Sequence, residues 1–399
     1  METRGRIYWV DALKAVIVVG ICLFHGSLVF SPGSWLVNNA ERSLVLGGFA
    51  AFTFQWGIAL MFILAGAASW FGLRSRGVWH FASSRVIRLG LPLAAGIAVL
   101  SPLQSYLEHT RTIEVGGLLR TYVTFWTSVH ITWSPASAYG LVFHLWFLTH
   151  LLAISLVTLP IAVWLRSGRG RNLIEGIVRS AGAPGAYLMG ALPLAAVQMA
   201  LHARFPAYQD WSDLAAWSVL YLCGFVLMSD ARFEAALRRH IANALVVALL
   251  VSATIGFLSL TGRVSEWDAH PDYSAGYLAY QALRSLNTWS WLVFLLGIGV
   301  RWLDRYNRLA EWGADMPMPF YVLHQPVLVV IARFVVGWNA GLWLKFFLIV
   351  STAIGVTLVL CEGVRRVRVL RVLFGLRGVA KPRLPRGPNV PDGARLTAL

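Results

Sequence analysis

The feature that most constrains this chain is a series of apolar stretches, each about 20 residues long and nearly free of charge. A helix of that length crosses the roughly 30 Å hydrocarbon core of a bilayer. Hydrophobic residues make up 57% of the 399 residues and charged residues only 13%, which is more apolar surface than a soluble protein of this size buries. The sequence therefore predicts an all-α integral membrane protein and excludes soluble, fibrous and disordered classes.

Windows of about 19 residues with continuous apolar character predict about ten transmembrane helices. Two of these windows are longer than a bilayer requires, which is typical of tilted helices. The predicted spans are residues 12–31, 46–72, 86–104, 139–165, 184–201, 214–229, 242–260, 286–303, 316–336 and 341–363.

The positive charges are distributed unevenly among the segments that join these spans. The net charge is +16, which in a soluble chain would suggest a nucleic-acid partner. If the N-terminus is cytoplasmic, 25 of the 34 Lys and Arg residues fall in cytoplasmic segments and six in outer segments. This positive-inside pattern predicts that both termini lie in the cytoplasm, and it attributes the basicity to orientation rather than to nucleic acid.

We expect one polytopic membrane domain over residues 1–375 and a cytoplasmic tail over 376–399. The tail is basic and rich in Pro and Gly, which is typical of a disordered segment beside the anionic inner leaflet. Asp11 and Lys14 at the start of the first span, with no small-residue cleavage site after it, argue against a cleaved signal peptide. The three cysteines lie singly within apolar stretches, so we expect neither a disulfide framework nor a metal site.

Ionisable residues inside a bilayer are costly and therefore mark functional sites. All 18 acidic residues fall in loops or at span edges, which leaves the mid-membrane positions to histidines, chiefly His25 and His324. Lys14 precedes His25 by 11 residues, which places both on nearly one helix face about 16 Å apart along the axis. Asp11 shares this face and is placed to pair with Lys14. A packing histidine and a snorkelling lysine are the alternative interpretation.

Two further motifs suggest functional side chains. Arg85 and Arg88, at i and i+3, are close enough to converge on one phosphate, although paired arginines also serve as orientation signals. His144 opens the fourth span near the outer face, beside aromatic residues. Pro326 follows His324 inside a span and frees a backbone carbonyl, which favours a kinked polar wall over a plain packing kink.

Two outer segments combine carboxylates with aromatic side chains. Residues 206–211 read PAYQDW, and residues 266–273 read EWDAHPDY. Sugar acceptors are often held by such faces, and an aromatic belt at the membrane surface explains both segments equally well.

The ordered motifs 8–14, 24–30, 35, 39–41, 62–66, 85 with 88, 144–148, 320–326, 361–363 and 370–375 run along most of the chain. In this order they resemble the membrane acyltransferase family 3, most closely its branch similar to the succinyltransferase of osmoregulated periplasmic glucans. Two positions depart from the family pattern. Lys14 stands where an arginine is common, which keeps the charge but loses the bidentate fork. Ala67 follows Gly66 where an aromatic residue is usual.

The resemblance implies an integral membrane O-acyltransferase of the bacterial inner membrane. Its donor would be cytoplasmic acyl-CoA, either acetyl-CoA or succinyl-CoA, with no permanently bound cofactor. Its acceptor would be a hydroxyl of an extracytoplasmic glycan. The candidate residues are Lys14, Arg85 and Arg88 for donor binding, His25 as general base, and His324 and His144 as orienting groups. A covalent acyl-histidine relay is the alternative to direct transfer.

Two other functions remain open from the sequence. Ten spans also suit a transporter or flippase that moves a glycan or lipid intermediate, although mid-membrane carboxylates for proton coupling and inverted repeats are not evident. The second alternative is an acyltransferase that modifies a small cytoplasmic molecule. The side of the membrane on which product forms would distinguish that enzyme from one that modifies a glycan.

Overall fold

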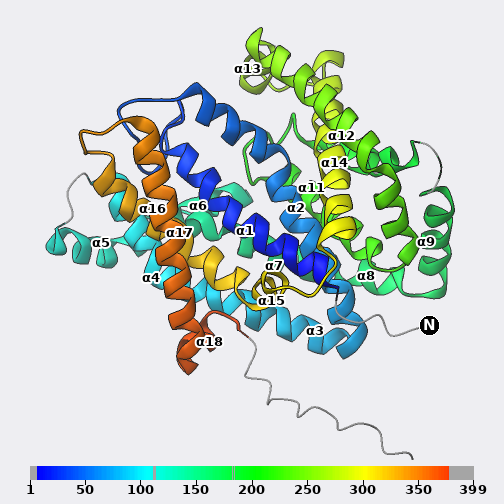
Figure 1. Cartoon of the computed structure of the whole chain (residues 1–399), viewed down its shortest axis with the longest axis horizontal. Coiled ribbons are helices and arrows are strands. Elements are labelled where there is room, and N and C mark those ends of the chain that lie inside the picture. Colours follow the sequence, from blue (N-terminus) through cyan, green and yellow to red (C-terminus); the bar gives the residue numbers. More distant parts are fainter. Residues whose placement is uncertain (1–6, 111–113, 182, 184, 377–399) are drawn as a thin grey trace, which may run out of the picture.

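The computed structural model describes residues 7–110, 114–181, 183 and 185–376, and all regular structure in these ranges is helical (Figure 1). Within them, eight helical segments are long and apolar enough to cross a membrane, and two shorter apolar helices accompany them. The prediction of an all-α membrane protein with about ten spans is confirmed. The predicted tail lies outside the described residues except for residue 376.

The long segments follow one another in the order of the predicted spans. They are α1 (Tyr8–Leu28), α2 (Leu44–Arg76), α3 to α4 (Val78–His109), η2 to α7 (Pro135–Val157), α12 (Ala231–Leu260), α14 with η5 (Ala275–Leu303), α16 (Pro317–Val335) and α17 (Leu342–Arg366). The two shorter apolar helices are η4 with α10 (Ala186–Leu201) and α11 (Trp211–Leu227). The remaining helices are α5 (Val115–Ser128), α8 (Leu159–Leu165), α9 (Gly168–Ala181), α13 (Arg263–Ala269), α15 (Arg308–Asp315) and α18 (Arg368–Leu373).

One predicted span is not a continuous helix. The sequence predicts a single span over 139–165. The structure divides it into α6 (Tyr139–Val142), η3 (Phe143–Leu145), α7 (Trp146–Val157) and α8, with η2 (Pro135–Ala138) in front. The break lies at Phe143, whose φ of 46° is left-handed and interrupts the helical hydrogen-bond ladder. Hydropathy does not reveal the break, because the residues around it are as apolar as those of an unbroken helix.

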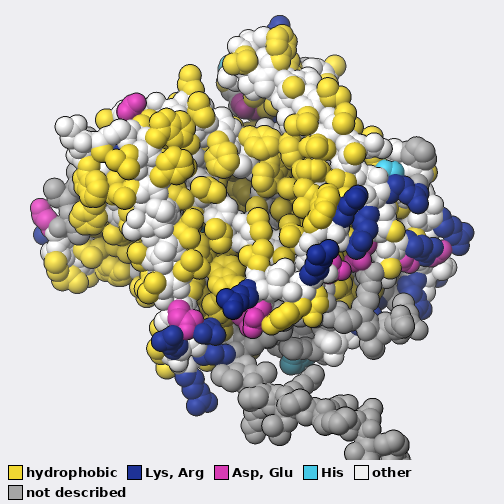
Figure 2. Space-filling view, in the orientation of Figure 1, with side chains coloured by type: hydrophobic (Ala, Val, Ile, Leu, Met, Phe, Trp, Pro, Cys, Tyr) yellow, Lys and Arg dark blue, Asp and Glu magenta, His cyan; other side chains and the backbone are white. Residues whose placement is uncertain are grey.

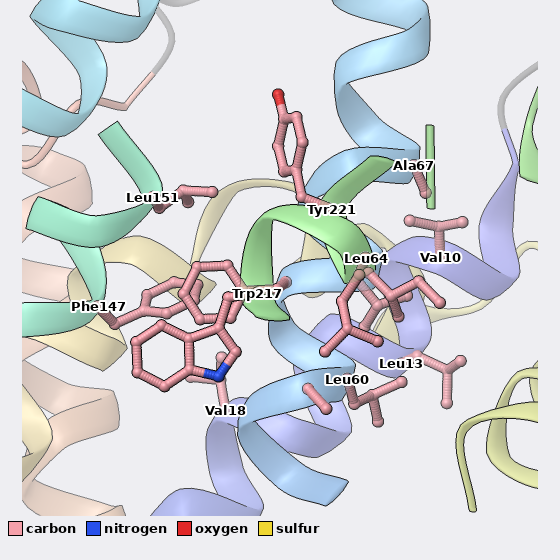
Figure 3. Close-up of a cluster of buried hydrophobic side chains, with 14 of the residues drawn as sticks. Val10, Leu13, Val18, Leu60, Leu64, Ala67, Phe147, Leu151, Trp217 and Tyr221 are labelled. Carbon is pink, nitrogen blue, oxygen red and sulfur yellow. The ribbon is translucent and has the colours of Figure 1, made fainter. Parts of the chain in front are cut away.

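Helix α1 runs through the middle of the bundle and contacts α2, α15, α16 and α17 (Figure 1). Figure 3 shows Val10, Leu13 and Val18 of α1 in one buried cluster with Leu60 and Leu64 of α2 and with side chains of α7 and α11. Lys14 and His25 of this helix line cavities inside the bundle, whereas Val16 and Leu23 are exposed on its outer side.

The outer surface is apolar where a bilayer would contact it. Figure 2 shows hydrophobic side chains over the middle of one face, with Lys and Arg gathered along its lower and right-hand edges. Leu250 and Phe257 of α12 and Phe347 of α17 are among the exposed apolar side chains. Large exposed apolar areas on long helices fit contact with lipid tails.

Helices α2 and α11 approach closely because both carry glycine at their contact. A Cβ added to Gly66 would collide with the backbone carbonyl of Tyr221, and one added to Gly224 would collide with the carbonyl of Ile63. Small residues let helices come together in membranes, where van der Waals packing drives their association. This packing fixes α11 against α2 and holds Tyr221 beside Ser69.

Gly224→Ala should therefore destabilise the folded protein by about 1–3 kcal/mol, because the two backbones must separate. Thermal unfolding of the purified protein in detergent, followed by circular dichroism, measures the change. Gly256→Ala on α12 is the matched control, because a Cβ at that position meets nothing within 4 Å. Because alanine has a higher helix propensity than glycine, we expect Gly256→Ala to leave the stability unchanged or to raise it slightly. Equal melting temperatures for the two variants would contradict the close-packing argument.

Candidate active site

Three histidines that are far apart in the sequence meet inside the bundle. His25 lies near the end of α1, His144 in η3 and His324 in α16. The Nδ1 atom of His25 is 2.9 Å from Nε2 of His324, and the rings of His144 and His324 lie edge to face with centroids 5.5 Å apart. The structure brings together all three residues that the sequence suggested as catalytic groups, and their chemical roles stay a prediction.

The hydrogen bonds assign the tautomers of the His25–His324 pair. Nδ1 of His324 lies 2.5 Å from the backbone carbonyl of Tyr321, and because a carbonyl only accepts, this nitrogen carries the proton. In neutral His324 the other nitrogen, Nε2, is then an acceptor, so His25 donates its Nδ1–H to it. The lone pair of His25 is left on Nε2, which has no hydrogen-bond partner among the described residues. His25 lines a large cavity, so this basic nitrogen is available to a substrate.

His144 is held by a carbonyl that Pro326 sets free. Pro326 has no N–H and cannot donate to the carbonyl of Val322 four residues earlier. That carbonyl accepts instead from Nε2–H of His144, at 3.0 Å. The hydroxyl of Tyr321 donates to the carbonyl of His144 in return. The sequence predicted a freed carbonyl at Pro326. This carbonyl accepts the hydrogen bond that links η3 to α16.

The backbone is strained at two points beside the histidines. Within the described ranges, Phe143 and Gln209 are the residues other than glycine with positive φ, at 46° and 69°. Phe143 directly precedes His144, and Gln209 lines the same cavity as His25. The N–H of Gln209 donates to Oδ2 of Asp213 at 2.9 Å, and its carbonyl accepts from Nε2 of His150 at 3.1 Å. Strain that neighbouring bonds enforce in this way is concentrated at functional sites.

The cavity beside His25 has a volume of about 820 Å³. None of the described residues that line it is Asp, Glu, Lys or Arg, and the polar lining side chains include His144, Gln209 and Gln325. The His25 ring stacks on Trp35 with centroids 5.7 Å apart and planes 12° from parallel. The aromatic lining residues include Phe24, Trp35, Phe54, Trp146, Tyr208 and Tyr321.

A second cavity, of about 250 Å³, holds the cationic residues that the sequence predicted as a donor site. Lys14 of α1, Arg85 at the end of α3 (Val78–Arg85) and Arg88 in the π-helical turn η1 (Val86–Gly90) all line it. Asp315 is the acidic residue in its described lining. Nζ of Lys14 lies 3.2 Å from Oδ1 of Asp11, so the ion pair expected from their spacing is present.

The guanidinium group of Arg85 is held in place by Ser69 and Phe81. Its guanidinium donates to Oγ of Ser69, which also accepts from the hydroxyl of Tyr221 at 2.7 Å. The same guanidinium lies over the Phe81 ring, 4.9 Å from its centroid. The π-helical turn that follows Arg85 is a feature frequently found at functional sites, because it shifts side chains relative to an unbroken α-helix.

Comparison with known proteins shows the family to which this chain belongs. The family described as acyltransferase domain matches residues 7–362. The chain belongs to this acyltransferase family. Proteins named glucans biosynthesis protein C, from Salmonella typhi and Salmonella typhimurium, are 22% identical to it over 382 residues, which cover 92% of this chain and 94% of theirs. No solved structure matches the chain significantly.

The family match covers every described residue that lines the larger cavity of the acyltransferase, and all of those that line the smaller one except Gly375 and Leu376. Together with its long apolar helices, it makes the protein a multi-pass enzyme of the cell inner membrane. Among the described residues, no group of three His, Cys, Asp or Glu side chains is arranged to hold a metal ion. His25 and His324 are hydrogen-bonded to each other, and His144 and His324 are each hydrogen-bonded to a backbone carbonyl.

The two cavities of the acyltransferase share a wall. Met61 of α2, Phe147 of α7 and Tyr321 of α16 line both of them. Phe147 and Tyr321 lie within motifs that carry the family resemblance, and Met61 directly precedes another one. The sequence does not single out these three as a group, because their meeting depends on the packing of three helices and leaves no signal in residue spacing.

Of the two outer segments with carboxylates and aromatic residues, one reaches the site. Tyr208 and Gln209 line the larger cavity. Residues 266–273 belong to α13 and the turn after it, and they line neither cavity. The interpretation of the first segment as part of an acceptor site stays a prediction, and the second segment has no place in it.

Pro326→Ala is expected to lower the rate of acyl transfer about 10- to 100-fold, because misplacing a catalytic group by about 1 Å costs that much. The new N–H at position 326 competes with His144 for the carbonyl of Val322. Initial rates in membranes, normalised to folded protein, measure the effect. Pro102→Ala, at another proline inside a helix (α4, Leu91–His109), is the control with unchanged rate. Full activity of Pro326→Ala would show that the freed carbonyl is unimportant.

Proposed function

We propose that this acyltransferase transfers an acyl group from cytoplasmic acyl-CoA to a hydroxyl of an extracytoplasmic glycan, with His25 as the general base. The observation that carries the proposal is a pair of cavities with a common wall, one lined by cations and the other by the basic nitrogen of His25. A donor with phosphates and an acceptor with hydroxyls would approach this wall from opposite sides. The positive-inside pattern supports a cytoplasmic position for the cationic cavity.

The cationic cavity suits the phosphates of CoA. The lining carries three positive groups, Lys14, Arg85 and Arg88, against one acidic residue, Asp315. A guanidinium group can donate two parallel hydrogen bonds to the oxygens of one phosphate. Lys14 and His25 are about 16 Å apart along α1. A donor whose phosphates are held near Lys14 must therefore extend a long arm along the helix to reach His25, and the pantetheine of CoA is such an arm.

In the proposed reaction, Nε2 of His25 takes the proton of the acceptor hydroxyl as the hydroxyl oxygen attacks the thioester carbonyl. The C–S bond then breaks, the acyl group remains on the acceptor as an ester, and the departing CoA thiolate takes the proton back from His25. Nε2 of His324 accepts the Nδ1–H of His25 throughout. This hydrogen bond orients the base and stabilises the positive charge that develops on it.

The larger cavity suits a sugar acceptor. Rings such as Trp35, Trp146 and Tyr208 offer flat faces to the C–H side of a pyranose. The side-chain amide of Gln209 supplies donors and an acceptor for hydroxyls, and the amide oxygen of Gln325 supplies a further acceptor. The relatives' name, glucans biosynthesis protein C, agrees with a glycan acceptor. A small cytoplasmic acceptor fits less well, because this cavity lies towards the end of α1 remote from Lys14.

Membranes that contain His25→Ala should transfer radiolabel from acyl-CoA to the envelope glycan fraction about 10²- to 10⁴-fold more slowly than wild type, which is the usual contribution of a positioned base. His240→Ala on α12 is the control, since His240 is also a buried histidine but lines neither cavity. Equal labelling by wild type and His25→Ala would contradict the mechanism and reopen the transporter interpretation. Label on a small molecule inside the vesicles would favour a cytoplasmic acceptor.

Arg88→Ala should raise the KM for acyl-CoA about 10-fold or more and change kcat little, because a phosphate contact far from the reacting atoms contributes mainly to donor binding. Arg88→Lys should give an intermediate KM, since it keeps the charge and loses the fork. Initial rates over a range of acyl-CoA concentrations measure both constants. Arg179→Ala, at an exposed arginine paired with Glu175, is the control. A fall in kcat at unchanged KM would move Arg88 out of the proposed donor site.

A further inference from the structure

The surroundings of His25 favour one chemical class of acyl group. A hydroxyl held by Nε2 of His25 attacks a carbonyl that lies beside it, so the rest of the acyl chain must occupy the larger cavity. Among the described residues that line this cavity, none carries a formal charge. We propose that the transferred acyl group is uncharged, such as acetyl or butyryl, and that a dicarboxylic group such as succinyl is disfavoured. This inference rests on the proposed function, because it takes His25 as the reacting base.

Three donor groups in the cavity lining already have partners within the protein. Nε2–H of His144 donates to a carbonyl of α16 at 3.0 Å, and the hydroxyl of Tyr321 donates to the carbonyl of His144. The side-chain amide of Gln325 donates to Oε1 of Gln104 at 2.9 Å. Nε2 of His25 carries a lone pair, and Nδ1 of His144 is buried with no partner in the described part of the chain. Both nitrogens accept only, so they offer a carboxylate repulsion instead of hydrogen bonds.

The walls next to His25 cannot compensate a negative charge. The rings of Phe24 and Trp35 lie beside His25, and their centroids are 5.2 and 5.7 Å from the centroid of its imidazole ring. A carboxylate moved from water to such surroundings loses its hydration and gains no cation in exchange. A terminal methyl group loses nothing comparable and gains contact with the aromatic faces.

The charged groups on the Gln209 side of the cavity do not reverse this balance. The carboxylate of Asp213 accepts from the N–H of Gln209 at 2.9 Å, at the edge of the cavity. Arg284 opposes the charge of Asp213, and its guanidinium is bonded to Gln281 at 3.2 Å. No net positive charge therefore reaches the cavity from this side.

Butyryl-CoA and succinyl-CoA provide the test, because their acyl chains are equally long and differ chiefly in the terminal carboxylate. We expect kcat/KM to be about 10-fold or more higher for butyryl-CoA. The assay is CoA release by the full-length protein in lipid nanodiscs, with the envelope glucan fraction as acceptor. Succinyl-CoA reacting as well as butyryl-CoA, or better, would overturn the inference and leave the proposed function standing. If neither ester, nor acetyl-CoA, releases CoA above the His25→Ala background, the proposed function falls and the inference falls with it.

A charge placed in the cavity gives a second measurement. Thr53 of α2 lines the cavity, and Thr53→Lys should raise the ratio of succinyl to butyryl kcat/KM about 3-fold or more, since an ammonium group pairs with the carboxylate. Thr53→Met adds similar length without charge and should leave the ratio at its wild-type value. The ratio is internal to each preparation, so a smaller folded fraction does not alter it. The same ratio in both variants would overturn the inference.

Discussion

The hydrogen bond between His25 and His324 is the contact on which the rest of the site depends. Inside a bilayer a buried imidazole depends on the protein for its hydrogen-bond partners. The carbonyl of Tyr321 fixes the proton on His324, and this fixes the proton on His25 in turn. The base is therefore defined by a backbone carbonyl of α16, two hydrogen bonds away from the nitrogen that would accept a proton. Burial in the membrane therefore fixes the orientation and the tautomer of both histidines.

Helix α1 connects the two halves of the site. The same helix presents Lys14 to the cationic cavity and His25 to the larger one, and because a helix rises about 1.5 Å per residue, the distance between the two groups is set by sequence spacing alone. The cluster in Figure 3 packs Val10, Leu13 and Val18 of α1 against α2, in one buried core with side chains of α7 and α11, on the helix turns around Lys14. Rigid packing there keeps the separation of the two groups constant, which matters for a donor bound at one end and reacting at the other.

The sequence was sufficient for the helical fold and for the three histidines, and insufficient for the wall between the cavities. Apolar length, which a bilayer imposes on any spanning helix, identifies the spans, and histidines stand out because ionisable residues in a bilayer are rare. The break at Phe143 and the meeting of Met61 with Phe147 carry no such signal. Both are produced by contacts between helices distant in the sequence, and their side chains are ordinary for a membrane segment.

Tyr321 shows how closely the wall and the base are linked. Its side chain lines both cavities, its hydroxyl donates to the carbonyl of His144, and its own carbonyl holds His324. Turning Tyr321 aside would break the bond to His144 and disturb the histidines. Met61 and Phe147 have no polar atom to anchor them, and the unbranched Met61 side chain adapts readily to a changed neighbour. In the proposed function, a donor arm that crosses the wall would therefore displace Met61 at the least cost, while Tyr321 keeps the base oriented.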